Sequence, residues 1–200
     1  MKNYWLSFWV TILLMTSSFA QEKVIPNQEK KYTIQVGYFA PYGTQYGARI
    51  GTNILIKHWL EKTKRNENRS HTLSITPRIG YFVNPNIQKN YSLDANLVYR
   101  WYKQNHAIHP KIGLSAGYLN SLQNTDGTLS LSDGTITYNT RTLNSFIPTI
   151  NIGFEKNRKT FIGYYISLFY GKKITAQEVN SAFFGAEIGI SFNFKNKNDE

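Results

Sequence analysis

Charged and amide side chains recur at every second position in several segments of this 200-residue chain, which places them on one face of each segment. Opposite charges on facing strands form ion pairs that help to fix the register of a sheet, whereas a continuous row of charges can guide ions. We therefore predict an internal polar network, with an ion pathway as the alternative. The predicted members are Arg49, Lys57, Arg78, Asp94, Asn96, Arg100, Lys111, Glu155 and Glu187.

The connections between segments predict which members of this network meet. With the loop after residue 83 centred near Ile87, Arg78 faces Asn96 and lies diagonal to Asp94, close enough for an ion pair. Arg100 and Lys111 lie nearly opposite each other across a short turn. This like-charge contact requires an acidic partner or water.

The four histidines, at positions 58, 71, 106 and 109, are the residues best suited to catalysis or metal binding. A hydrolytic site needs a nucleophile, a histidine base and an orienting acid, and the chain contains no G-x-S-x-G motif. His106 and His109 form an i, i+3 pair without a nearby carboxylate, and the chain has no cysteine. We therefore predict no catalytic residue, no metal site and no cofactor.

Eight segments alternate apolar and polar residues with a period of two, and no long segment has the period of a helix. Each segment is about as long as the roughly 9–11 residues that a tilted membrane-spanning strand requires. The predicted strands lie near 32–39, 48–58, 73–83, 91–102, 109–119, 146–155, 160–170 and 181–195.

Glycine indicates which face of these strands is concave. Nine of the fourteen glycines lie within predicted strands, and all nine fall on the polar face. Because glycine inside a strand costs order and packing, a one-sided excess indicates crowding or strong curvature on that face. The polar face is therefore predicted to line a narrow barrel, and the apolar face suits a lipid exterior. A soluble barrel with a ligand cavity would require the opposite facing.

The N-terminus indicates export. Residues 1–20 combine Lys2, an apolar stretch and a Ser18-Phe19-Ala20 ending that fits the small-x-small cleavage rule. We predict a signal peptide at 1–20, a short periplasmic segment at 21–30, the barrel at 31–195 and a polar tail at 196–200. The full chain has a formal net charge of +11. In an exported protein, such a surplus of basic residues favours a membrane surface or an acidic polysaccharide over nucleic acid.

The lengths of the connections and the aromatic residues predict the orientation. With both termini periplasmic, the long connection 120–145 faces outward, together with 40–47, 84–90 and 171–182. The connections 59–72, 103–108 and 156–159 then face the periplasm. Aromatic rings favour both membrane interfaces. The outer set is Tyr38, Tyr81, Tyr91, Tyr118, Phe146, Tyr170 and Phe184, and the periplasmic set is Trp59, Trp101, Tyr102, Phe154, Phe192 and Phe194.

The strand pattern over 31–195, and above all the last strand FFGAEIGISFNF, resembles the outer membrane β-barrel domain family of small eight-stranded OmpA/OmpX-type barrels. The resemblance implies an all-β, antiparallel, up-and-down transmembrane barrel in the bacterial outer membrane. It also implies that the terminal aromatic Phe194 helps the barrel-assembly machinery to recognise the chain. The sequence departs from the family by adding KNKNDE after Phe194.

These features predict an integral outer-membrane protein with a structural or surface-interaction role, and with membrane lipids and the assembly machinery as partners. Residues 120–145, rich in Asn, Thr and Ser, are the expected surface for an extracellular protein or glycan. A narrow channel or small-ligand binder is the first alternative. A lipid-modifying or proteolytic outer-membrane enzyme is the second.

Overall fold

The computed structural model describes residues 32–62, 68–85, 87–103, 108–129, 136–156, 161–176 and 180–194. Within these ranges the chain forms nine strands, and no helix there is long and apolar enough to cross a membrane. The strands are β1 (Tyr32–Pro41), β2 (Tyr46–Lys62), β3 (Asn68–Asn84), β4 (Gln88–Lys103), β5 (Ile108–Leu129), β6 (Ile136–Phe146), β7 (Thr149–Lys156), β8 (Ile162–Thr175) and β9 (Ser181–Phe194).

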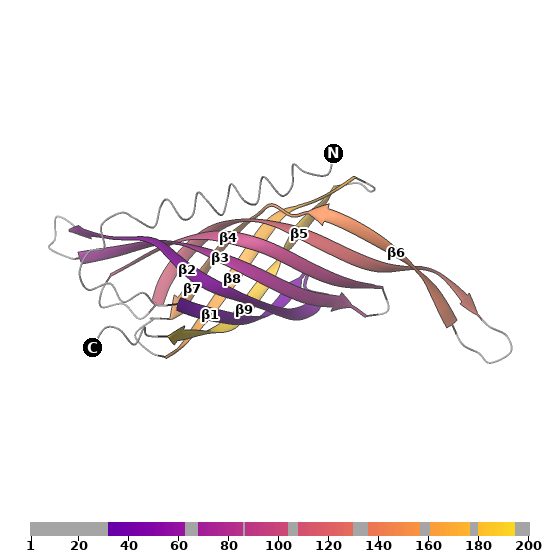
Figure 1. The fold of residues 1–200 in the computed structure, drawn as a ribbon, viewed down its shortest axis with the longest axis horizontal. Coiled ribbons are helices and arrows are strands. Elements are labelled where there is room, and N and C mark those ends of the chain that lie inside the picture. The colour runs from indigo at the N-terminus through magenta and orange to yellow at the C-terminus, as the bar shows by residue number, and fades with distance from the viewer. Residues whose placement is uncertain are drawn as a thin grey trace. The chain divides into compact units, whose positions relative to one another are not determined.

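The strands form a closed antiparallel ring (Figure 1). Strands that follow one another in the sequence pair with each other, except that β6 and β7 each pair with β5 and β8. The ring closes where β1 pairs with β9 along ten residue pairs, from Tyr32–Phe194 to Pro41–Gly185. Closure gives hydrogen-bond partners to the backbone N–H and C=O groups that an open sheet edge would expose to hydrocarbon.

The segments β6 and β7 together make one strand of the ring. Phe146 lies opposite Tyr118 and Thr149 lies opposite Ser115, so the register against β5 is unbroken. The interruption arises at Pro148, which has no backbone N–H to donate to the ladder. The barrel therefore has eight strands around its wall, which confirms the predicted fold class.

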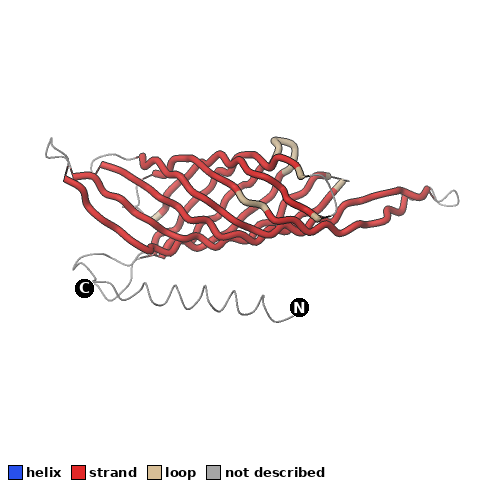
Figure 2. The backbone as a smooth tube through the Cα atoms, turned by 90° about the horizontal axis from the view of Figure 1, so that it is seen from above, coloured by secondary structure: helices blue, strands red, loops and turns tan. Residues whose placement is uncertain are grey.

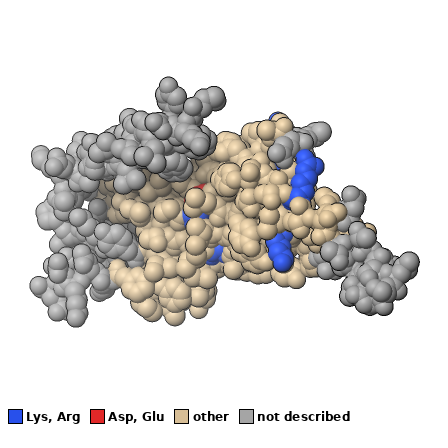
Figure 3. Space-filling view, turned by 45° about the vertical axis from the view of Figure 1, so that its right-hand side comes forward, with Lys and Arg blue, Asp and Glu red and all other residues tan. Residues whose placement is uncertain are grey.

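The two faces of the wall differ as the alternation predicts. Large apolar side chains such as Ile79, Leu93 and Ile188 are exposed on the outside, whereas serine, asparagine and charged side chains are buried inside. The face drawn in Figure 3 carries few charged groups, and the largest patches of lysine and arginine lie toward its right-hand side. Since water would favour the opposite arrangement, this surface is suited to lipid.

The two ends of the barrel differ in their connections. We call the end with the β1–β2, β3–β4, β5–β6 and β8–β9 connections the hairpin end, because β5 and β6 extend there beyond the rest of the barrel (Figures 1 and 2). The other end, where β1 begins and β9 ends, is the terminal end. All seven aromatic side chains predicted for the outer interface are exposed near the hairpin end. Near the terminal end Trp101, Phe154 and Phe194 are exposed, while Trp59 and Phe192 are partly buried. The side chain of Tyr102 lies outside the described residues.

Several predicted connections are shorter in the structure. Strands β2 and β3 leave only 63–67 between them, where a turn over 59–72 was predicted, and β5 and β6 leave only 130–135 of the predicted loop 120–145. Continued pairing explains this difference, since Trp59 faces His71 and Asn124 faces Thr140.

Two register predictions are wrong. Lys57 was predicted to face inward, but a β-bulge between Leu55 and Lys57 places it opposite the outward Leu73, and the lysine is exposed. The extra residue reverses the alternation locally. Arg78 lies directly opposite Asp94 rather than Asn96, because the β3–β4 pairing is centred one position earlier than predicted, with Asn84 opposite Gln88.

Candidate functional site

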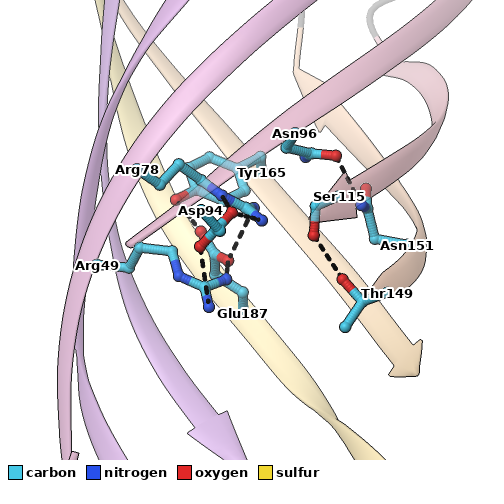
Figure 4. Close-up of polar contacts among 9 residues, drawn as sticks. All are labelled: Arg49, Arg78, Asp94, Asn96, Ser115, Thr149, Asn151, Tyr165 and Glu187. Carbon is cyan, nitrogen blue, oxygen red and sulfur yellow. Dashed lines mark hydrogen bonds and ion pairs between the residues drawn. The ribbon is translucent and has the colours of Figure 1, made fainter. Parts of the chain in front are cut away.

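An ion cluster crosses the middle of the barrel interior (Figure 4). Arg49 Nη1 donates to Glu187 Oε2 at 2.9 Å, and Arg78 Nε donates to Asp94 Oδ1 at 2.7 Å. The pairs are joined by Arg49–Asp94 and Arg78–Glu187 contacts, both of 3.6 Å. Two guanidinium groups thus face two carboxylates, so the cluster is balanced in charge. The four side chains come from β2, β3, β4 and β9, and they tie opposite parts of the wall together.

Tyr165 of β8 connects this cluster to a second one. Its hydroxyl donates to Glu187 Oε1 at 2.7 Å, and the Lys111 ammonium lies 4.4 Å from the centre of its ring. The side chain has room because Gly37 and Gly189 face each other on β1 and β9. A Cβ on Gly189 would come within 2.6 Å of the ring, and a Cβ on Gly37 would collide with the hydroxyl. This is the crowding that the one-sided glycine pattern predicts.

The second cluster lies nearer the terminal end and is built around Arg100. Its Nε is 2.9 Å from Glu155 Oε2, its Nη2 donates to Asn53 Oδ1 at 3.0 Å, and its Nη1 donates to Ser74. Arg100 lies directly opposite Lys111, as predicted. Glu155 supplies the acidic partner that this like-charge contact requires.

An apolar plug fills the interior near the hairpin end. It consists of Phe39, Phe82, Leu119, Ile147, Phe169 and Phe183. The rings of Phe39 and Phe169 stack at 4.9 Å, and the Arg49 guanidinium lies 3.6 Å from the centre of the Phe39 ring. The plug therefore rests directly on the ion cluster. A cavity of about 10 Å³ remains between them, which is about enough for one water molecule.

The structure places eight of the nine predicted network residues inside the barrel. They are Arg49, Arg78, Asp94, Asn96, Arg100, Lys111, Glu155 and Glu187, all except Lys57. Asn96 accepts a hydrogen bond of 2.9 Å from the Asn151 amide rather than joining the ions. Phe194 is exposed at the end of β9 opposite Tyr32, and its role in assembly stays a prediction.

Sequence reasoning missed Tyr165 and the apolar plug. In 160–170 both faces carry aromatic residues, so the contrast in polarity that marked the other strands is absent. The spacing still indicated which residues face inward, because every second residue, Gly163, Tyr165, Ser167 and Phe169, lies on the same face. An interior predicted to be polar throughout is therefore apolar at the hairpin end.

The described histidines lie near the terminal end and do not form a hydrolytic triad. His58 Nε2 is hydrogen-bonded to Ser70 Oγ at 2.6 Å, whereas Glu61 contacts a different histidine, His71, at 3.1 Å. His71 also stacks against Trp59 at 5.4 Å between ring centres. His106 lies outside the described residues. In the parts of the chain that are described, no three potential metal ligands gather.

The β5–β6 hairpin forms the largest feature outside the barrel. The two strands pair from Tyr118–Phe146 to Leu129–Ile136, with a bulge between Asn124 and Gly127. β6 pairs with β8 only at Ser145 and Phe146. At Thr142 and Asn144, none of the described strands pairs with the side of β6 that faces away from β5.

No protein-family model and no curated protein matches the chain. Among solved structures, the chain is similar to the N-terminal β-barrel domain of Pseudomonas aeruginosa OprF, with 14% identity, a TM-score of 0.48, and coverage of 83% of this chain and 98% of that chain. It is similar to the outer membrane enzyme PagL, with 12% identity, a TM-score of 0.49, and coverage of 80% and 98%. It is also similar to Ail, the attachment invasion locus protein of Yersinia pestis, with 13% identity, a TM-score of 0.40, and coverage of 84% and 100%. By its own strand order, closure and apolar exterior, the chain has the fold of the small outer-membrane β-barrels.

Proposed function

We propose that this protein is an integral outer-membrane barrel that binds an extended segment of an extracellular protein along its β5–β6 hairpin. The observation that carries the proposal is the edge of β6 at Thr142 and Asn144, against which none of the described strands pairs. An exposed strand edge offers a row of N–H and C=O groups, and a partner in extended conformation can pair with it as an added strand.

The register identifies the backbone groups that face this edge. The Ile147 N–H donates to Gly117 O on β5 at 2.8 Å. Because N–H groups alternate in direction along a strand, the N–H groups of Thr142 and Asn144 point away from β5. Both side chains are exposed, and the neighbouring residues are mostly threonine, asparagine and arginine. The edge is therefore polar, which suits recognition at a surface in contact with water.

The rest of the barrel supports a binding role over transport. The apolar plug and the two ion clusters fill the interior, and the cavity between plug and ions has a volume of about 10 Å³. A narrow channel would require a continuous hydrated path through these residues.

A non-enzymatic role is part of the proposal, and the histidine contacts support it. Ser70, whose hydroxyl lies 2.6 Å from His58 Nε2, is 2% exposed, and His58 is not the histidine that contacts Glu61. A hydrolase would need these three groups in one relay and open to substrate.

The test uses cells that display the full-length protein on surfaces coated with laminin, with heparin as a separate probe. In one variant, residues 125–139 are replaced by Asn-Gly, which joins Asn124 to Thr140 through a tight turn. In the second, Thr142→Pro removes one edge donor while the bonds to β5 remain. We expect both variants to reduce retention of the cells on laminin by about tenfold.

Thr142→Ala is the matched control, because it shortens the same side chain but keeps the backbone N–H. It should retain cells like the natural protein. If the shortened hairpin binds laminin as well as the full chain does, the hairpin is not the interaction surface. If both proline and alanine variants lose only heparin binding, the partner is a glycan read by side chains.

A further inference from the structure

A groove crosses the outside of the wall beside Pro148. It has a volume of about 640 Å³ and is lined by residues of β5, β7, β8 and the start of β9, together with Pro148 and Asn180. The lining includes Leu114, Pro148, Ile150, Tyr170, Lys172 and Asn180. This volume lies in the ~300–1,000 Å³ range of small-molecule sites. The hydroxyls of Ser115 and Thr149, 2.5 Å apart, separate the groove from the interior cavity.

Pro148 leaves one backbone acceptor in this wall without its ladder donor. The Lys172 N–H donates to Pro148 O at 3.1 Å, but Pro148 has no N–H to return to the Lys172 carbonyl. A carbonyl oxygen without a donor is costly at the edge of hydrocarbon. A bound molecule that carries a hydroxyl or ammonium group would satisfy it.

The side chains around this carbonyl offer a cation above an apolar surface. Lys172 is exposed, and no ion pair joins it to a carboxylate in the described ranges. Leu114, Ile150 and Tyr170 are exposed on the lipid-facing side of the wall. Tyr170 belongs to the aromatic set near the hairpin end, which marks the level of the lipid head groups.

We propose that this groove binds one membrane phospholipid whose head group carries both a phosphate and a hydrogen-bond donor. The phosphate lies against the Lys172 ammonium, and the hydroxyl or amine of the head group donates to the Lys172 carbonyl. The first part of an acyl chain covers Leu114 and Ile150. The positive charge of Lys172 favours the phosphate. The Lys172 carbonyl, which receives no hydrogen bond from Pro148, favours a head group with a hydroxyl or an amine.

The test is a titration of the detergent-solubilised full chain with lipids of equal acyl chains, followed by native mass spectrometry. Phosphatidylglycerol and phosphatidylethanolamine carry a phosphate and a donor, whereas phosphatidylcholine carries a phosphate alone. We expect one molecule of either of the first two to bind about tenfold more tightly than phosphatidylcholine. Equal binding of all three lipids would overturn the proposal.

Two variants separate the two contacts. Lys172→Gln should weaken binding of all three lipids, whereas Pro148→Ala restores a ladder donor and should remove only the preference over phosphatidylcholine. Lys173→Gln is the matched control, since it makes the same change one residue away on the other face of β8. If Lys173→Gln weakens binding as much as Lys172→Gln does, the attraction is due to general charge and the groove is not the site. Binding of glycerol phosphate with equal strength would show that the acyl surface contributes nothing, which also contradicts the proposal.

Discussion

At the scale of single residues, Glu187 holds the interior together. It accepts from Arg49 and from Tyr165, and it lies 3.6 Å from Arg78. Taking charges out of water is costly, and their attraction compensates only when the remaining hydrogen-bonding groups are satisfied. The net contribution of such a cluster is small while it is complete, but loss of one member leaves the others buried without compensation.

We therefore expect Glu187→Gln to lower the free energy of unfolding by about 3–5 kcal/mol. Urea unfolding in lipid vesicles, followed by the loss of the fast-migrating folded form on unboiled gels, measures this change. Glu61→Gln is the control, because Glu61 is 60% exposed and its contact with His71 should contribute less than about 1 kcal/mol. Equal effects of both substitutions would mean that the cluster does not hold the wall together.

At the scale of the strand, alternation decides which residues meet lipid. On β9 the outward Ile188 faces Tyr38 of β1 and Ile166 of β8, both of which are exposed. The bulge at Ile56 in β2 and the proline at 148 are two places in the barrel wall where a strand departs from this regular pattern. One bulge was enough to turn Lys57 from the predicted interior to the outside.

Ile188→Arg should lower the free energy of unfolding in vesicles by about 2–4 kcal/mol, since it places a charge near the middle of the bilayer. The same urea titration measures it. Ile188→Leu, which keeps the site apolar, should change the free energy by less than about 1.5 kcal/mol. An arginine tolerated as well as leucine would mean that this face does not contact lipid.

At the scale of the whole barrel, the interior is closed in two ways. The apolar plug blocks the hairpin end, and the ion clusters occupy the centre and the terminal half. Eight strands enclose a space that side chains can fill.

The purified barrel in a planar bilayer should therefore give no steady stepwise conductance. A general-diffusion porin in the same bilayer is the positive control. Reproducible conductance steps from the natural chain would favour the narrow-channel alternative. They would also show that the plug opens.

The sequence by itself determined which residues face in and which face out in most strands. The period of two is a local property, and it placed eight of nine predicted network residues inside without knowledge of their partners. It also located the eight strands of the wall, because each apolar face had to be long enough to cross hydrocarbon.

Only the tertiary structure decided which inward residues meet. Arg49 and Glu187 are separated by 138 positions, and closure of β1 on β9 brings them together. The bulge before Lys57 and the register that pairs Arg78 with Asp94 depend on how neighbouring strands pair. Alternation along one strand does not determine this register. Phe39, Phe169 and Phe183 form a plug because they share one level of a closed barrel. That level is set by the tilt and stagger of strands, which are properties of the ring rather than of any one segment.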